Sequence, residues 1–268
     1  MKHHLSPNKS DPKKLFQKKS LGQHFLRSEK VLEEMCAEAE VNTGDVVLEI
    51  GPGEGTLTTT LLAKGATVIA LEKDHRLIPI LQEKFATEIT EKKLILKEAD
   101  VLEFDPAEIA APIYKIVANI PYYITGAILE KFLSAVRQPS CMVLLVQKEI
   151  AERIVARDGK ESILSISVKA YGQPKNVQKV SRGLFSPPPK VDSAILAISN
   201  ISKKNFKNAE EENSFFKIVK AGFAHKRKML KNNLADIGII YETNARAEEL
   251  PVQEWLTISS ATRLSPEL

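Results

Sequence analysis

Asparagine, proline and tyrosine follow one another directly behind a short apolar run, in the stretch VANIPYYIT of residues 117–125. The exocyclic amine of adenine is a poor nucleophile because its lone pair is delocalised into the ring. The side-chain oxygen of Asn119 and a neighbouring backbone carbonyl of the Asn119-Ile120-Pro121 loop could accept both amine hydrogens and direct the lone pair towards a methyl donor. Pro121 stiffens the loop, and Tyr122 offers a ring face to an extruded base. The alternative is an ordinary strand-terminating turn.

A glycine-rich turn follows an earlier apolar run and contains Gly51, Gly53 and Gly55 in the stretch EIGPGEGTLT. Glycine allows the backbone to approach a ligand closely, and the N-terminus of the next helix presents free N–H groups. The spacing G-x-G-x-G differs from the dinucleotide fingerprint G-x-G-x-x-G, because residue 56 is threonine. A tight structural turn is the alternative for this pattern alone.

Two carboxylates stand at the ends of the next two apolar runs. Glu72 lies 21 residues after Gly51, where an acidic residue can bind both hydroxyls of a ribose. Asp100 follows the third run, where a carboxylate can accept a hydrogen bond from an adenine amino group. Together with the glycine turn they predict a nucleoside-cofactor site, and the glycine spacing favours S-adenosylmethionine over NAD. The VANIPYYIT stretch leaves the same predicted sheet edge, which favours the chemical interpretation of Asn119.

The elements that must position these residues alternate regularly from residue 45 onward. Short β-branched runs at 45–50, 67–72, 93–100, 114–119 and 141–147 are separated by amphipathic stretches, which predicts an α/β fold with a parallel sheet covered on both faces. Residues 176–180 and 191–199 predict an antiparallel pair at one edge of this Rossmann-like sheet. Upstream, residues 28–41 predict a helix that Ser28 could cap.

The chain divides into three predicted parts. Residues 1–17 form a basic tail, residues 18–200 a cofactor-binding catalytic domain, and residues 201–268 a small all-α domain with helices over 212–224, 226–237 and 252–260. Trp255 on the last of these helices is predicted to be a core residue.

Charge is unevenly distributed, although the net charge is only +4. Residues 1–30 carry eight Lys and Arg against two acidic residues, and residues 203–233 carry nine against three. Clustered bases suit a polyanionic partner such as nucleic acid. The two cysteines, Cys36 and Cys141, lie far apart without metal-ligand spacing, so neither a disulfide nor a metal site is expected. With no apolar signal or membrane segment expected, we predict a cytoplasmic protein.

Eight stretches in this order resemble the KsgA-type small-subunit ribosomal RNA adenine-N6 dimethyltransferases. They are KKSLGQHFL (18–26), VLEIGPGEGTLT (47–58), VIALEKD (68–74), EAD (98–100), VANIPYYIT (117–125), VQKEIAERI (146–154), LFSPPPKVDSAI (184–195) and GFAHKRKMLKNNL (222–234). The resemblance spans about residues 18–234 and is specific in combination, although single motifs are weak.

The resemblance implies a class I methyltransferase fold and S-adenosylmethionine as the methyl donor. It implies four methyl transfers, two to each of two adjacent adenines near the 3′ end of small-subunit (16S) rRNA, on an assembling subunit. It adds His24 and Leu26 to the cofactor-binding positions Gly51, Gly53, Glu72, Asp100 and Asn119, although many members have asparagine where His24 stands. It also implies that Phe185 helps Tyr122 to hold the target base, with a core role for Phe185 as the alternative.

Other functions remain open from the sequence. A related methyltransferase that modifies large-subunit rRNA and confers antibiotic resistance would share the Asn119 loop, and a ribosome-assembly or transcription-associated factor could keep the fold without the catalysis. A DNA adenine methyltransferase would need more room for a duplex-reading domain, and the glycine spacing disfavours an NAD-dependent dehydrogenase. The basic segment 225–233 is either a solvated helix face or a surface that contacts RNA phosphates. A monomer is expected.

Overall fold

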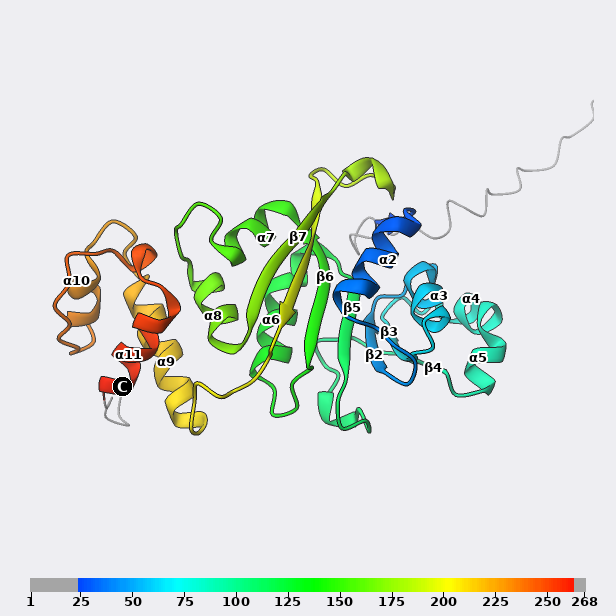
Figure 1. Cartoon of the computed structure of the whole chain (residues 1–268), viewed down its shortest axis with the longest axis horizontal. Coiled ribbons are helices and arrows are strands. Elements are labelled where there is room, and N and C mark those ends of the chain that lie inside the picture. The colour runs from blue at the N-terminus through cyan, green and yellow to red at the C-terminus, as the bar shows by residue number, and fades with distance from the viewer. Residues whose placement is uncertain (1–23, 263–268) are drawn as a thin grey trace, which may run out of the picture.

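The computed structural model describes residues 24–262, and a seven-stranded sheet forms its centre (Figure 1). The strand order is β4-β3-β2-β5-β6-β9-β7, and all neighbours are parallel except at β9, which runs antiparallel to both β6 and β7. The strands are β2 (Val46–Ile50), β3 (Thr67–Glu72), β4 (Leu94–Glu98), β5 (Lys115–Asn119), β6 (Cys141–Gln147), β7 (Gln173–Val180) and β9 (Ser193–Ser199). The predicted sheet, mostly parallel with an antiparallel edge, is confirmed.

Helices cover both faces of the sheet because its central strands are apolar on both sides. In β2, Leu48 and Ile50 face one apolar cluster and Val47 faces another, and each of the three is at most 3% exposed. The first cluster is covered by α6 (Thr125–Ser134), α7 (Lys148–Val155) and α8 (Ile163–Tyr171). The second is covered by α2 (Glu29–Glu38), α3 (Thr56–Ala63) and α4 (Ile78–Lys84), with the short α5 (Ala86–Thr90) beside β4.

A third apolar cluster lies among the C-terminal helices, which stand apart from the sheet at one end of the molecule in Figure 1. It is formed by α9 (Ala209–Gly222), α10 (Leu230–Ala235) and α11 (Val252–Ala261), with Trp255 fully buried as predicted. Ile166 and Ala170 of α8 also join this cluster, so α8 contributes to the packing of both parts. Among residues 24–262, no helix is long and apolar enough to span a membrane.

The structure corrects three local predictions. Helix α10 begins at Leu230 rather than residue 226, because residues 224–229 form a turn that Asn233 holds by donating to the carbonyls of Gly222 (2.6 Å) and His225 (3.2 Å). Ser28 occupies the N-cap position of α2, but its side chain makes no capping hydrogen bond. Helices α5 and α8 were not predicted.

The sequence of α8 disguises a helix because it is rich in serine and β-branched residues, which have low helix propensity. A capping box offsets this weakness. Ser162 accepts from the backbone N–H of Ser165 at 3.1 Å, and the Ser165 hydroxyl oxygen accepts from the backbone N–H of Ser162 at 2.6 Å. The predicted basic tail, residues 1–17, lies outside the described residues.

Candidate active site

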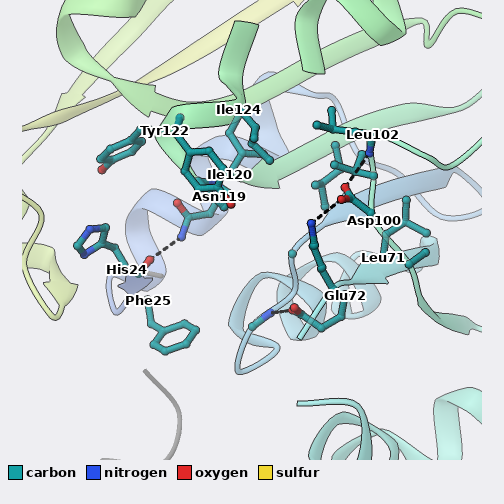
Figure 2. A pocket seen from close by; sticks show the side chains of 18 residues that line it. His24, Phe25, Leu71, Glu72, Asp100, Leu102, Asn119, Ile120, Tyr122 and Ile124 are labelled. Atoms are coloured by element: carbon teal, nitrogen blue, oxygen red, sulfur yellow. Dashed lines mark hydrogen bonds and ion pairs between the residues drawn. The ribbon is translucent and has the colours of Figure 1, made fainter. Parts of the chain in front are cut away.

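A pocket opens at the carboxyl ends of four neighbouring parallel strands, β5, β2, β3 and β4 (Figure 2). Each strand or the loop behind it supplies one of the predicted residues to the pocket lining, namely Asn119, Gly51, Glu72 and Asp100. Ligands of open α/β sheets bind at this edge, because the loops there diverge and leave a crevice. The structure therefore brings together the residues that the sequence singled out on separate apolar runs.

The Glu72 carboxylate at the end of β3 is held by backbone donors. Its Oε2 accepts from the N–H of Gly53 at 3.1 Å, and its Oε1 accepts from the N–H of Asp74 at 2.8 Å. The residue is 5% exposed, and burial raises the pKa of its carboxyl above the ordinary value while these two hydrogen bonds oppose the rise. A carboxylate has about four acceptor positions, so the bonds to Gly53 and Asp74 leave capacity for a ligand's hydroxyl groups.

The glycine turn supplies a backbone that a ligand can approach. Gly51 has φ of 67° and lines the pocket, and a Cβ placed on it would meet no atom of the described residues within 4 Å apart from its chain neighbours. Gly53 has φ of 59°, and a Cβ there would lie 2.7 Å from the ring of Phe25, another lining residue. Both glycines adopt a left-handed conformation that other residues reach only with strain.

The Asp100 carboxylate accepts from two donors at the far side of the pocket. Lys73 donates to its Oδ2 at 2.6 Å, and the backbone N–H of Leu102 donates to its Oδ1 at 3.0 Å. The hydrogen bond from Lys73 is the main reason that the pKa of Asp100 lies below its ordinary value. Asp100 is therefore ionised at neutral pH and suited to accept from an amino group.

Within the described part of the chain, the side-chain amide of Asn119 has one hydrogen-bond partner, as Figure 2 shows. Its Nδ2 donates to the backbone carbonyl of His24 at 3.0 Å. A carbonyl can only accept, so the amide nitrogen must face His24 and the oxygen Oδ1 points away from it. The asparagine lines the pocket, so this oxygen is an acceptor that a ligand there can use.

Aromatic rings stand beside this amide. The Tyr122 hydroxyl shares a 2.7 Å hydrogen bond with the Ser193 hydroxyl of β9, and burial raises the pKa of the phenol. The rings of Tyr122 and His24 are nearly parallel, at 23°, with centroids 6.1 Å apart. His24 is itself held through its Nδ1, which lies 2.8 Å from the carbonyl oxygen of Pro187. Tyr123, the second tyrosine of the stretch, is 65% exposed at the pocket mouth.

Two predicted residues, Leu26 and Phe185, are absent from the described pocket lining. Leu26 of β1 (Phe25–Leu26) pairs with Phe185 of β8 (Phe185–Ser186), and both side chains belong to the buried cluster beneath α2 and α3. Phe185 is 4% exposed and is not among the described residues that line the pocket. Its role in holding a base stays a prediction, and its visible function is to pack beneath the segment that carries His24.

Three residues at the site were not predicted from the sequence, namely Phe25, Lys73 and Ser193. Lys73 could have been identified from its place directly behind Glu72 at a strand end. Ser193 could not, because its contact with Tyr122 joins residues 71 positions apart.

A second buried acid lies under the glycine turn. Glu49 of β2 is 1% exposed and accepts a 2.6 Å hydrogen bond from the hydroxyl of Thr58 in the first turn of α3. Burial raises the pKa of Glu49 to about 8, and the charge of Glu72 acts in the same direction. Glu49 is not one of the residues that line the pocket. Its hydrogen bond with Thr58 connects β2 to α3, the two elements on either side of the glycine turn.

The fold and the site together define a class I methyltransferase, with a glycine turn and two carboxylates at successive strand ends beside an acceptor loop. The model of the family described as ribosomal RNA adenine dimethylase matches residues 15–262. The chain belongs to this family, and it is an rRNA adenine methyltransferase.

Individual relatives agree with the family match. The ribosomal RNA small subunit methyltransferase A of Dehalococcoides mccartyi (strain CBDB1) is 43% identical over 253 residues, which cover 89% of this chain and 86% of the relative. The protein of the same name from Thermosynechococcus vestitus is 37% identical, with 92% and 97% covered.

Two solved structures are similar over nearly the whole described chain. A dimethyladenosine transferase from Plasmodium falciparum has a TM-score of 0.73 at 26% identity, covering 88% of this chain and 96% of that one. The 23S rRNA methyltransferase ErmE has a TM-score of 0.72 at 27% identity, covering 88% and 98%. The fold is thus shared with an enzyme named for 23S rRNA, whereas the two sequence relatives are named for the small subunit.

Proposed function

We propose that this chain transfers methyl groups from S-adenosylmethionine to the N6 amines of two adjacent adenines near the 3′ end of small-subunit (16S) rRNA, on an assembling subunit. The observation that carries the proposal is the orientation of Asn119, whose Oδ1 is turned away from His24 at the sheet edge where Glu72 and Asp100 also lie. The names of the more similar relatives favour the small subunit as the substrate. Ribosome assembly would make the cytoplasm the site of action.

The polar groups of the pocket fit an adenosyl cofactor. The free acceptor positions of Glu72 suit the two ribose hydroxyls, and the ionised Asp100 suits the adenine amine. The open backbone at Gly51 leaves room for the part of the cofactor that carries sulfur. When bound, S-adenosylmethionine supplies an electrophilic methyl group, and no metal is required for that chemistry.

The Asn119 loop would make the target amine reactive. Asn119 Oδ1 and a backbone carbonyl of the loop accept the two N6 hydrogens, which localises the nitrogen lone pair and fixes its direction. The product ammonium loses a proton to water, so the loop needs no general base. Pro121 has no N–H that could compete for these acceptors.

The target base would be held beside Tyr122. The Tyr122 ring is held in position by the hydrogen bond between the Tyr122 and Ser193 hydroxyls. A flipped adenine can stack on the face of this ring. Phe185 would support the base only indirectly, through the buried packing of β1 and β8.

The RNA would also contact the turn between α9 and α10. Its residues His225, Lys226, Arg227 and Lys228 are all exposed, which suits contacts with phosphates. We expect recognition here by charge and shape, because A-form RNA offers side chains little access to its deep major groove. The protein is proposed to act as a monomer.

The second candidate is methylation of large-subunit rRNA, which the similarity to ErmE favours. The deciding experiment incubates the protein with labelled S-adenosylmethionine and under-methylated small or large subunits in separate reactions, followed by base-resolved mapping. Dimethyladenosine at adjacent adenines of small-subunit RNA is expected. Label on the large subunit alone would refute the small-subunit proposal while leaving the Asn119 chemistry in place.

A further inference from the structure

Lys73 donates to the carboxylate that is proposed to receive the adenine amine of the cofactor. It follows Glu72 at the end of β3, lines the same pocket and places its ammonium 2.6 Å from Oδ2 of Asp100. Because the N–H of Leu102 donates to Oδ1, each oxygen of Asp100 already has a donor, as the dashed lines at Asp100 in Figure 2 show. The lysine side chain is 62% exposed, so it can leave this position without disturbing the core.

The lysine ammonium and an adenine amine can both donate a hydrogen bond to Asp100, but the two bonds differ in strength. A charged N–H donor forms a shorter and stronger hydrogen bond with a carboxylate than a neutral amine does. The proximity of the two groups raises the pKa of Lys73 and lowers that of Asp100, so both remain charged at neutral pH. A neutral adenine amine must therefore displace a stronger donor from the Asp100 carboxylate or share the carboxylate with it.

We propose that Lys73 competes with the adenine of the cofactor for Asp100 and thereby sets the affinity of the pocket for adenosyl ligands. The inference rests on the proposed function, in which Asp100 receives the adenine amine. Only molecules whose Asp100 is free bind the ligand fully, so the apparent dissociation constant rises as the fraction of free Asp100 falls. An exposed ion pair is weak, so the effect is about two- to fivefold.

The test replaces the lysine by methionine, because Lys73→Met keeps an unbranched side chain but removes the charge. Calorimetry measures the Kd of S-adenosylhomocysteine, a ligand without net charge. At about 50 mM salt the variant is expected to bind about two- to fivefold more tightly than the wild type. At about 500 mM salt the difference shrinks, because screening weakens the competing ion pair of the wild type. Lys73→Arg keeps the charge and is expected to bind like the wild type.

Lys93→Met is the matched control. Lys93 is 63% exposed and pairs with Glu91 at 2.7 Å. It precedes β4, whereas Asp100 follows β4, so the two residues lie at opposite ends of this strand. We expect Lys93→Met to bind S-adenosylhomocysteine with the same Kd as the wild type. Equal or weaker binding by Lys73→Met, or an equal gain in Lys93→Met, would overturn the competition. A wild-type protein that does not bind S-adenosylhomocysteine at all would instead contradict the proposed cofactor, so the two failures are distinguishable.

Discussion

The buried carboxyl of Glu49 makes the stability of this protein depend on pH in a way that one substitution should remove. Desolvation is the main reason that its pKa rises from 4.5 to about 8 in the folded chain, where Thr58 is its hydrogen-bond donor. The folded state therefore favours the protonated acid. The contribution of Glu49 to stability is complete below the pKa of its carboxyl in the unfolded chain. It is lost as the pH rises through the pKa of this carboxyl in the folded chain.

The size of this effect follows from the two pKa values. Each pH unit between them corresponds to about 1.4 kcal/mol, so ionising Glu49 in the folded chain costs at most about 5 kcal/mol. Between about pH 5 and pH 8 the free energy of unfolding should fall by roughly 3 kcal/mol because of this group alone. Glu49→Gln keeps an acceptor for Thr58 but cannot ionise, so its stability should not show this fall.

Urea unfolding of the wild type and Glu49→Gln at several pH values measures the difference directly. The advantage of the variant over the wild type should grow steadily towards high pH. Glu83→Gln, which changes an exposed carboxyl on α4, serves as the control and should follow the wild type. Parallel pH curves for the wild type and Glu49→Gln would refute the assignment of a neutral buried acid.

Three further substitutions test the pocket. Gly53→Ala combines a left-handed backbone with a Cβ close to the ring of Phe25, so we expect a loss of about 1–3 kcal/mol in stability and about tenfold weaker cofactor binding; an unchanged melting temperature and Kd would contradict this. Tyr122→Phe loses the bond to Ser193 but keeps the ring, so single-turnover methyl transfer should fall less than about tenfold, and a complete loss would assign chemistry to the hydroxyl. Asp100→Ala should weaken calorimetric cofactor binding at least about tenfold with little change in stability, and binding equal to the wild type would remove Asp100 from the site.

The site could be predicted from sequence because its residues stand at strand ends. Parallel strands buried on both faces read as continuous apolar runs, so the ends of β3 and β5 are visible as the points where Glu72 and Asn119 interrupt them. Once the strands are parallel, their carboxyl ends must share one edge. The register of the sheet then determines that these side chains converge, without any knowledge of their contacts.

What the sequence did not reveal depends on contacts between distant segments. The orientation of the Asn119 amide depends on the carbonyl of His24, 95 residues earlier. The turn that precedes α10 depends on Asn233 reaching back to Gly222, against a local sequence that favours a helix. Phe185 is aromatic and could stack on a base, but in the structure it is buried where β8 pairs with β1. The sequence alone did not reveal this pairing.

The Asn119→Ala variant tests the proposed mechanism most directly, because Asn119 Oδ1 is the acceptor proposed to make the adenine amine reactive. Single-turnover methylation of under-methylated small subunits would be measured beside the binding of S-adenosylhomocysteine and of the subunit. We expect the rate of transfer to fall by about 10²–10³, with RNA binding nearly intact and cofactor binding changed only a few-fold. An equal loss of binding and transfer would mean that Asn119 is structural, and transfer at the wild-type rate would contradict the mechanism.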